Sequence, residues 1–281
     1  MYISDDTIER FLKEDVPYMD LTTLVLGIGN ELGQIRFMAR EEMVLSGTEE
    51  VARIFGKLGI KVTKLLPTGT LVEKGETFII ADGLAANLHM AWKVSLNILE
   101  YCCGIATKTR RFVDKAKSIN PDISILTTRK SFPGTKELAI KSIVAGGGFP
   151  HRLGLSETIL IFKQHVNFIG GFEQLPKAVK QIRNNACEKK IIVEVENKAE
   201  AILIVEAGVD GLQFDKIPAL DLKRIVESIR LINPKMVLIA AGGVNEGNVQ
   251  EYANTGVDAI ATTSTYFGKP ADIKVTIERL Q

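Results

Sequence analysis

The stretch that decides the fold is IIVEVENKAEAILIVEAGVDGLQFD, residues Ile191–Asp215. Its ends, Ile191–Val195 and Gly211–Phe214, are short apolar runs typical of strands buried on both faces of a sheet. Lys198–Ala207 between them has helical spacing, and Gly208 suits the position that follows a helix. A strand, a helix and a second strand in this order predict two parallel strands with a covering helix.

The same alternation extends in both directions, from Ile123 to near the C-terminus. Further strands are expected at Ile123–Thr127, Thr158–Phe162, Met236–Ala240 and Ala259–Thr262, and further helices at Lys136–Val144, Glu173–Asn184, Ala219–Ile232 and Asn248–Thr255. Short apolar strands that alternate with helices favour a closed or nearly closed α/β barrel. An open, doubly wound sheet is the alternative.

The residues before this alternation follow a different pattern. The expected elements are a helix at Asp5–Glu14, a turn-rich connector at Glu14–Thr23, an exposed strand at Gly33–Ala39, a helix at Thr48–Leu58, antiparallel strands within Lys61–Ala81, and a long helix at Leu84–Thr107 that continues through Lys108–Lys117. The change of pattern predicts two domains. Residues 1–106 form a small N-terminal α/β sandwich with a long helix, and residues 107–281 form an incomplete α/β barrel of six or seven strands.

Composition indicates an ordinary soluble globular protein. Hydrophobic residues make up 46% and charged residues 25% of the 281 positions. Lys and Arg number 35 against 34 Asp and Glu, so no overall field favours nucleic acid or a membrane surface. No apolar run approaches the roughly 20 residues that span a bilayer, and the N-terminus has no secretory signal pattern. We therefore expect a cytoplasmic protein.

The three cysteines have spacings that fit neither a disulfide framework nor a metal site. Cys102, Cys103 and Cys187 are expected to be buried thiols in a reducing compartment.

Cations gather beside glycines and prolines in Thr127–His165. The segment contains Arg129, Lys130, Lys136, His151, Arg152, Lys163 and His165. Binding several carboxylates or phosphates requires fixed donors and close backbone approach, which such a segment supplies. The alternative is a solvated basic loop. However, Arg129-Lys130 closely follows an apolar strand and His151-Arg152 directly follows the glycine-rich turn GGGFP, and this placement favours a site.

Further polar groups follow the other strands, where α/β barrels carry their active sites. Glu194 and Asp215 could hold Mg²⁺ or stabilise a cationic transition state, the alternative being solubilising charges. Gly242-Gly243 before a helix, with Thr263 and Ser264 after the next strand, predict a phosphate site. This combination suits transfer or cleavage of a phosphorylated sugar that has an acidic partner.

Several motifs in a fixed order carry a family resemblance over nearly the whole chain. They are EDVPYMDLTT, SLNILEYCCGIAT, TTRKSFPGTK, GGGFPHRLGLSETILIF, EVEN, LQFDK, AAGGV and TGVDAIA. The chain resembles the type II quinolinate phosphoribosyltransferases (carboxylating nicotinate-nucleotide pyrophosphorylases) of NAD biosynthesis. Within that family it is most similar to the ModD branch, which is associated with molybdenum transport.

The resemblance implies a reaction, a cofactor and a partner. Quinolinate is joined to phosphoribosyl pyrophosphate with Mg²⁺, and pyrophosphate and carbon dioxide are released. The active form is a homodimer or a dimer-based hexamer, with sites shared across the interface. By motif position, Arg129, Lys130, His151 and Arg152 match the family's substrate-binding cations, Glu194 and Asp215 match its carboxylates near ribose and metal, and Gly242-Gly243 match its phosphate-binding glycines. We expect Lys130, Glu194 and Asp215 to be catalytic.

Several positions depart from the family pattern, among them Ala241 at a family serine and Phe267 at a family histidine. Lys93 stands where the family has an arginine contributed across the dimer, Lys136 stands where it often has arginine, and lysine lacks the bidentate fork. Phe162 stands at a family lysine position, and Lys163 is expected to point to the opposite face of a strand. Three hypotheses therefore stay open: a changed, less anionic heteroaromatic acceptor, retained quinolinate activity, and a non-catalytic binder of a small anion linked to molybdenum transport.

Overall fold

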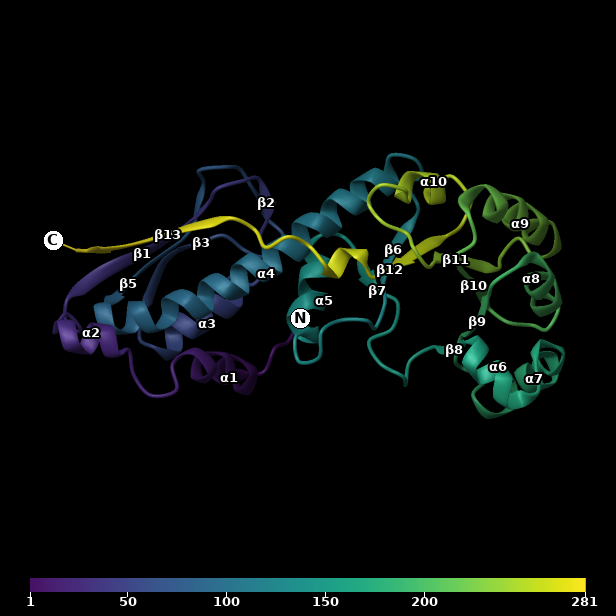
Figure 1. The fold of residues 1–281 in the computed structure, drawn as a ribbon, viewed down its shortest axis with the longest axis horizontal. Coiled ribbons are helices and arrows are strands. Elements are labelled where there is room, and N and C mark those ends of the chain that lie inside the picture. The colour runs from purple at the N-terminus through teal and green to yellow at the C-terminus, as the bar shows by residue number, and fades with distance from the viewer. Residues whose placement is uncertain (281) are drawn as a thin grey trace. The chain divides into compact units, whose positions relative to one another are not determined.

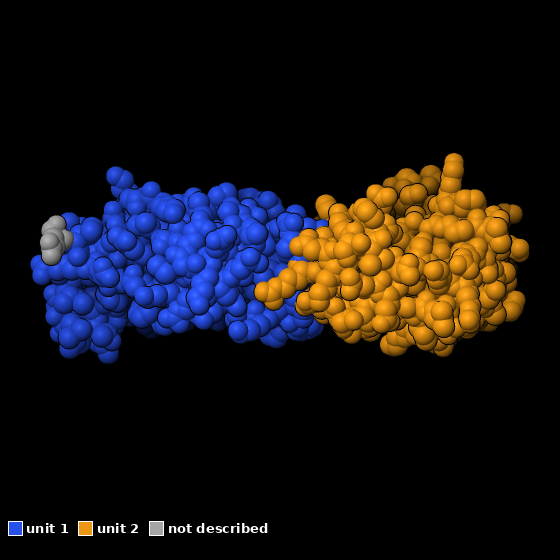
Figure 2. Space-filling model, turned by 90° about the horizontal axis from the view of Figure 1, so that it is seen from above, with its two compact units in different colours: residues 1–110, 132–147, 266–281 blue, residues 111–131, 148–265 orange. Residues whose placement is uncertain are grey.

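The computed structural model describes residues 1–280, which divide into two compact units (Figure 2). Unit 1 comprises residues 1–110, 132–147 and the C-terminal segment from 266, and unit 2 comprises residues 111–131 and 148–265. The chain thus crosses between the units at 110/111, 131/132, 147/148 and 265/266, whereas the sequence predicted one boundary at 106/107. None of the helices in residues 1–280 combines the length and apolar character that crossing a bilayer needs.

Unit 1 is built around an antiparallel sheet of order β13-β1-β5-β3 (Figure 1). Its strands are β1 (Leu32–Ala39), β3 (Lys61–Leu65), β5 (Thr77–Leu84) and β13 (Ile273–Arg279), with a separate pair of β2 (Met43–Val44) and β4 (Leu71–Val72). The helices are α1 (Asp5–Asp15), α2 (Leu21–Leu26), α3 (Thr48–Lys57), α5 (Lys136–Ala145) and most of α4 (Ala85–Lys117).

Three features of unit 1 differ from the sequence prediction. Strand β1 was expected to be exposed, but it is an inner strand between β13 and β5, and its Ile35 and Phe37 are fully buried in the apolar core. Strand β13 was not predicted. Helix α2 lies in the expected connector and is capped by Asp20, whose side chain accepts hydrogen bonds from the amides of Thr22 and Thr23.

Unit 2 is a seven-stranded parallel sheet of order β7-β6-β12-β11-β10-β9-β8. Its strands are β6 (Ser124–Thr127), β7 (Phe149–Pro150), β8 (Ile159–Ile161), β9 (Ile191–Val195), β10 (Gly211–Asp215), β11 (Val237–Ala241) and β12 (Ala259–Thr262). The helices are α6 (Lys163–Ile169), α7 (Leu175–Asn185), α8 (Lys198–Val205), α9 (Ala219–Ile232) and α10 (Val249–Ala253), with 3₁₀ turns at Phe172–Gln174 and Ser264–Tyr266. Because β7 and β8 are the two edges, the barrel is incomplete, which confirms the predicted fold class.

Alternation along the strands separates two faces of this sheet. Ile191, Val193 and Val195 of β9 join the large apolar core, which also contains residues of the helices. Ile192 joins a smaller apolar cluster on the other face, and Glu194 shares that face because side chains two residues apart point the same way. The smaller cluster consists of Leu160, Ile192, Ile239, Ala241, Ala259 and Ala261, with Leu126 and Phe162 packed against it.

Two similar arginine–aspartate pairs, which we call the clamps, lie at the amino ends of the strands. In the first, Arg183 of α7 binds Asp210 at 2.6 Å and the carbonyls of Lys189 and Gly208, while the Asp210 carboxylate accepts from the Ile191 amide at 2.7 Å. The second repeats this pattern one unit later. Arg230 of α9 binds Asp258 at 2.7 Å and the carbonyls of Met236 and Gly256, and Asp258 accepts from the Leu238 amide.

Candidate active site

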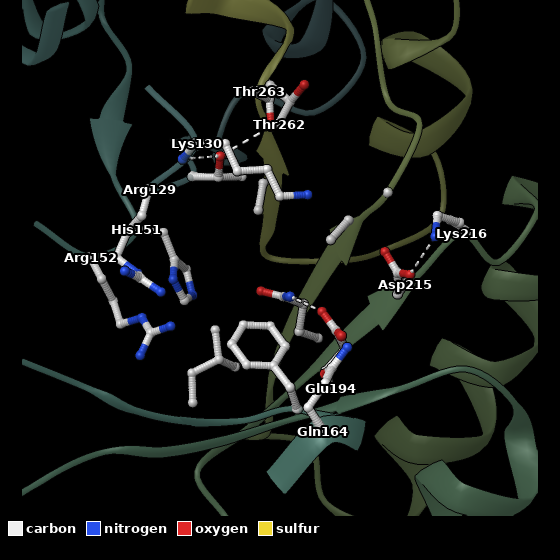
Figure 3. Close-up of a pocket in the computed structure, with 17 residues that line it drawn as sticks. Arg129, Lys130, His151, Arg152, Gln164, Glu194, Asp215, Lys216, Thr262 and Thr263 are labelled. Atoms are coloured by element: carbon white, nitrogen blue, oxygen red, sulfur yellow. Dashed lines mark hydrogen bonds and ion pairs between the residues drawn. The ribbon is translucent and has the colours of Figure 1, made fainter. Parts of the chain in front are cut away.

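A cavity of about 470 Å³ lies at the carboxyl ends of the unit 2 strands (Figure 3). Its size falls in the usual range for small-molecule sites. The predicted site residues that line it are Arg129, Lys130, His151, Arg152, Phe162, Glu194, Asp215, Gly242 and Thr263. Sequence order alone separates these residues by up to half the chain, and the parallel sheet brings them together.

One side of the cavity is basic. Arg129 and Lys130 follow β6, and His151 and Arg152 follow β7. Strand β7 pairs in parallel with β6, so both pairs of side chains emerge at the same edge of the sheet. Arg152 is only 6% exposed and donates to the carbonyl of Thr158 at 3.4 Å. In Figure 3, Arg129, His151 and Arg152 lie together on one side of the cavity.

The basic residues are not all cations. Burial, and then the positive charge of Arg152, lower the pKa of His151 below its ordinary value, so the imidazole is neutral near pH 7. A neutral imidazole offers one N–H donor and one acceptor, and the role of His151 as a substrate-binding cation stays a prediction. Burial, and then the neighbouring Arg129, also lower the pKa of Arg152, which stays charged. Fixed positive charge on this side comes from Arg129, Lys130 and Arg152.

The other side of the cavity is acidic. Glu194 and Gln213 face each other in register on β9 and β10, and Gln213 Nε2 donates to Glu194 Oε2 at 2.6 Å. Burial raises the pKa of Glu194, and the charges of Asp215 and Glu196 raise it further, against the hydrogen bond from Gln213 and the charge of Lys130. Asp215 Oδ2 lies 3.2 Å from Lys216 Nζ. Figure 3 shows Glu194 and Asp215 across the cavity from the arginines.

These two carboxylates are the candidate metal ligands. No group of three or more histidine, cysteine, aspartate or glutamate side chains within residues 1–280 could hold an ion without other ligands. Magnesium commonly takes one or two carboxylates and completes its shell with substrate phosphates and water. Glu194 and Asp215 fit that pattern, because a bound cation would offset both the burial that raises the pKa of Glu194 and the repulsion from Asp215 that adds to it.

The glycine turn after β11 supports Asp215. Gly242 has φ +77°, and a Cβ there would meet the Asp215 carboxylate and lie 2.7 Å from the Lys216 amide nitrogen. Lys216 in turn donates its amide to the Ala241 carbonyl at 2.9 Å. Helix α10 begins at Val249 with Asn248 at its N-cap position, close to the predicted start at Asn248, so it does not follow Gly243 directly. A loop held by its own side-chain hydrogen bonds separates the two.

The remaining predicted phosphate residues divide into two groups. Thr263 lines the cavity and its hydroxyl lies 3.0 Å from that of Thr128. Gly243 and Ser264 are not among the lining residues. Ser264 begins a 3₁₀ turn and donates its amide to Thr262 Oγ1 at 3.0 Å. Any role of Gly243 and Ser264 in phosphate binding stays a prediction.

The end of β8 supplies an uncharged side of the cavity, made by Leu160, Phe162 and Gln164. Lys163 is not part of it, since its Nζ pairs with Glu196 at 2.7 Å and half of its side chain is exposed. We expected Lys163 to be turned away by strand alternation. The structure gives a different reason. Strand β8 ends at Ile161, and helix α6 begins at Lys163 with Phe162 at its N-cap position.

Lys93 and Lys136 belong to unit 1, and their predicted contact with substrate stays a prediction. Lys93 is exposed on α4, with its Nζ 4.2 Å from the ring centre of Trp92. Lys136 is the first residue of α5.

Sequence reasoning missed several lining residues, namely Thr128, Leu160, Gln164 and Gln213. Strand position could have found Gln213, which directly faces Glu194. The buried thiols were only partly as expected, because Cys102 and Cys103 are buried whereas Cys187 is exposed.

Comparisons with known proteins agree with this arrangement. Residues 20–103 match the family model of the quinolinate phosphoribosyl transferase N-terminal domain, and residues 105–276 match that of the C-terminal domain. A protein of Pasteurella multocida named ModD is 37% identical over 279 residues, 99% of each chain. A protein of Methanothermobacter thermautotrophicus named as a carboxylating nicotinate-nucleotide pyrophosphorylase is 29% identical, covering 98% of this chain and 99% of its own.

A solved structure gives the same result for the fold. The nicotinate-nucleotide pyrophosphorylase from Ehrlichia chaffeensis superposes with a TM-score of 0.90 at 29% identity, and the match covers 99% of this chain and all of that one. With both domains of one family matched in order along a single chain, the protein belongs to the quinolinate phosphoribosyltransferase family of enzymes.

Proposed function

We propose that the unit 2 cavity transfers a phosphoribosyl group from phosphoribosyl pyrophosphate to the ring nitrogen of a pyridine-type acid and releases pyrophosphate. The observation that carries the proposal is that Arg129 and Arg152 face Glu194 and Asp215 across one cavity. Arginines suit the anionic groups of both substrates, and carboxylates suit the positive charge that develops on the ribose as pyrophosphate leaves.

Each residue then has a definite part in the transfer. The nitrogen lone pair of the acceptor attacks ribose C1, the bond from C1 to the pyrophosphate oxygen breaks, and the electron pair leaves with pyrophosphate. Glu194 and Asp215 stabilise the charge at C1, while Lys130, which follows β6 beside Thr128, offers its ammonium group to the departing oxygens. The turn at Gly242 and the Thr263 hydroxyl would receive a phosphate group.

Magnesium is part of the proposal. Glu194 and Asp215 would hold it, with pyrophosphate oxygens and water as its other ligands. When bound, it neutralises charge on the leaving group.

The alternative of a non-catalytic anion binder fits the cavity less well. Two carboxylates would repel a small oxyanion and weaken its binding. Burial also raises the pKa of Glu194, because its negative charge is unfavourable in the cavity. Calorimetry with molybdate and with phosphate would reveal such a binder through tight binding that persists without phosphoribosyl pyrophosphate.

The proposal also includes a homodimer. The segment around α2 carries large apolar side chains that are mostly exposed in a single chain: Tyr18, Leu21, Leu24, Val25 and Leu26. Contiguous exposed apolar side chains mark interaction surfaces. Lys93 on α4 is close to Trp92, which lines a depression with Leu21 and Leu26. In a dimer formed through this surface, we propose that Lys93 is the residue offered to the neighbour's site, as the family resemblance implies.

Mixing two inactive variants tests shared sites. K93A removes the residue offered to the neighbour, and E194Q removes a residue of the chain's own cavity. If sites are shared, heterodimers contain one intact site, and the mixture regains up to roughly a quarter of wild-type activity by random pairing. A mixture as inactive as its components, from chains shown by light scattering to exchange, contradicts shared sites.

The transfer itself is tested by incubating the purified protein with phosphoribosyl pyrophosphate, Mg²⁺ and a panel of pyridine carboxylates. Pyrophosphate release and the mass of the nucleotide product are the measurements. The R129A variant should be inactive, whereas K163A should retain activity, because Lys163 lies outside the cavity and pairs with Glu196. Pyrophosphate release no higher than that of R129A with every acceptor would refute the proposed function.

A further inference from the structure

We propose that Phe162 restricts the acceptor to a flat aromatic ring with a single carboxylate, and that a second carboxylate next to the ring nitrogen is rejected. This inference rests on the proposed transfer and narrows its substrate class. Its basis is the distribution of charge and apolar surface around the cavity.

Charge is unevenly placed around the acceptor's side of the cavity. Its fixed cations follow the adjacent strands β6 and β7, whereas β8 contributes Leu160, Phe162 and Gln164. Leu160 belongs to the small apolar cluster on the inner face of the sheet, and Phe162 packs against that cluster. A ligand can therefore anchor one anionic group on the arginines while its flat body covers an apolar surface.

Phe162 is held in place by its surroundings. Its amide donates to His165 Nδ1 at 3.0 Å, and its ring stacks on the His165 imidazole with 5.8 Å between centres and 23° between planes. Arg152 Cζ lies 5.8 Å from the centre of the same ring. The aromatic ring and the arginine that would bind the carboxylate are thus in contact, so the apolar and anionic parts of the acceptor are bound side by side.

These contacts separate one carboxylate from two. The first carboxylate replaces water with the guanidinium donors of Arg152 and Arg129. A second carboxylate held against Phe162 and Leu160 would lose its water and gain no cation, with only the neutral amide of Gln164 nearby, which is strongly unfavourable for a charged group. We expect kcat/KM to favour the monocarboxylate by about 100-fold or more.

The chemistry of the product follows from this choice. The ring nitrogen forms its bond to ribose C1 and pyrophosphate departs with the electron pair of the broken bond. A monocarboxylate keeps its carboxylate in the product, so one pyrophosphate is released per nucleotide and no carbon dioxide.

The test compares pyridine-2,3-dicarboxylate with pyridine-2-, 3- and 4-monocarboxylate on the wild-type protein. Turnover is followed by pyrophosphate and nucleotide formation. Release of carbon dioxide is measured with acids that carry an isotopic label in the carboxylate, and binding of each acid is measured by calorimetry. Tighter binding and faster turnover of one monocarboxylate, without carbon dioxide, are expected. Equal or stronger binding of the dicarboxylate overturns the inference even in a protein that turns over nothing. Absence of all turnover refutes the transfer instead.

Three variants examine the roles of Phe162 and His165. F162K supplies the missing cation and should raise kcat/KM for the dicarboxylate by at least about 10-fold while lowering it for the monocarboxylate; F162L keeps an apolar side chain and should keep the wild-type preference. H165N retains an acceptor for the Phe162 amide but loses the stacked ring. As a change at a positioning residue, it should raise KM for the acceptor several-fold and leave kcat unchanged. An F162K protein that binds substrate yet keeps the wild-type preference would show that Phe162 does not set specificity.

Discussion

The two ends of the parallel sheet in unit 2 treat charge in opposite ways. At the amino ends, each clamp joins an arginine to an aspartate, and both groups also bind backbone atoms. At the carboxyl ends, like charges are neighbours: Arg129 lowers the pKa of Arg152, and Asp215 helps to raise the pKa of Glu194. The first arrangement favours the folded chain, and the second favours a ligand that carries both charges.

The pKa directions of one carboxylate at each end express this difference. Burial opposes ionisation of Asp210, but the Ile191 amide and Arg183 outweigh it and hold the pKa of Asp210 below its ordinary value. At Glu194 burial prevails and the pKa is raised. Ionised Asp210 therefore stabilises the fold, whereas ionised Glu194 destabilises it in the absence of a ligand. A carboxylate therefore supports folding at one end of the sheet and function at the other.

The largest effect is expected for E194Q. Removing a carboxylate that stabilises developing positive charge should lower kcat/KM by about 10²–10³-fold. Stability near pH 7 should be unchanged or higher, because an unfavourable buried charge is removed. Steady-state kinetics and thermal unfolding measure the two quantities. The control is E196Q, at the exposed residue directly after the same strand, which should change neither by much. A large loss of stability in E194Q would contradict the contrast between the two ends.

A glycine substitution examines how the carboxyl end is held. G242A combines φ +77° with a Cβ that would displace Asp215 and Lys216, so activity should fall by about 100-fold from misplacement alone. G243A has the same φ but no atom within 4 Å of its Cβ, so it should show only the backbone strain, about 1 kcal/mol of stability. Equal kinetic losses in the two variants would mean that Asp215 is not positioned by this turn.

Variants of the clamps should lose stability and keep activity, the reverse of the variants at the carboxyl ends. R230A removes hydrogen bonds to Asp258 and to the Met236 carbonyl, and it should lower the free energy of unfolding by about 2 kcal/mol. Activity per folded molecule should remain, since the clamp is at the other end of the strands. The matched control is R224A on the same helix, whose pair with Asp221 is long and exposed and should contribute less than about 0.5 kcal/mol. Urea unfolding and kinetics at low temperature distinguish the outcomes.

The sequence predicted unit 2 well because its strands are apolar on both sides. Ile191–Val195, Ala259–Thr262 and the helix Ala219–Ile232 occur with the predicted bounds. Strand β13 was missed although Ile273, Val275 and Ile277 alternate with polar residues as in a strand, whereas its pairing with β1, more than 230 residues earlier, has no local signal. The crossings between the units were missed for the same reason.

The sequence predicted which residues form the site but not their protonation states. Strand ends gave Arg129, Glu194 and Asp215, but the neutral form of His151 depends on burial beside Arg152, which exists only in the folded chain. Only one partner of each clamp could be recognised from the sequence. The turns that contain Asp210 and Asp258 could be recognised from their glycines, whereas their arginines lie in the helix before the preceding strand.

The smallest expected effect is a difference in how stability changes with pH. The folded pKa of Asp210 is below its unfolded value, so its contribution is complete above the unfolded value near 3.8 and is lost as pH falls through the folded pKa. The folded pKa of Glu194 is above its unfolded value near 4.5, so its contribution is complete below that value and is lost as pH rises through the folded pKa. The two ends should thus respond to pH with opposite sign.

Urea unfolding of wild type, D210N and E194Q, followed by circular dichroism across the acidic range, measures this response. The stability advantage of wild type over D210N should shrink as the pH falls, and its disadvantage against E194Q should grow as the pH rises toward neutrality. Each slope is at most that of one proton, about 1.4 kcal/mol per pH unit. The Q213L variant sharpens the result, because losing the hydrogen bond from Gln213 raises the pKa of Glu194 further. The acid limb of its activity profile should then move to higher pH, and a limb that stays in place would show that Glu194 does not control it.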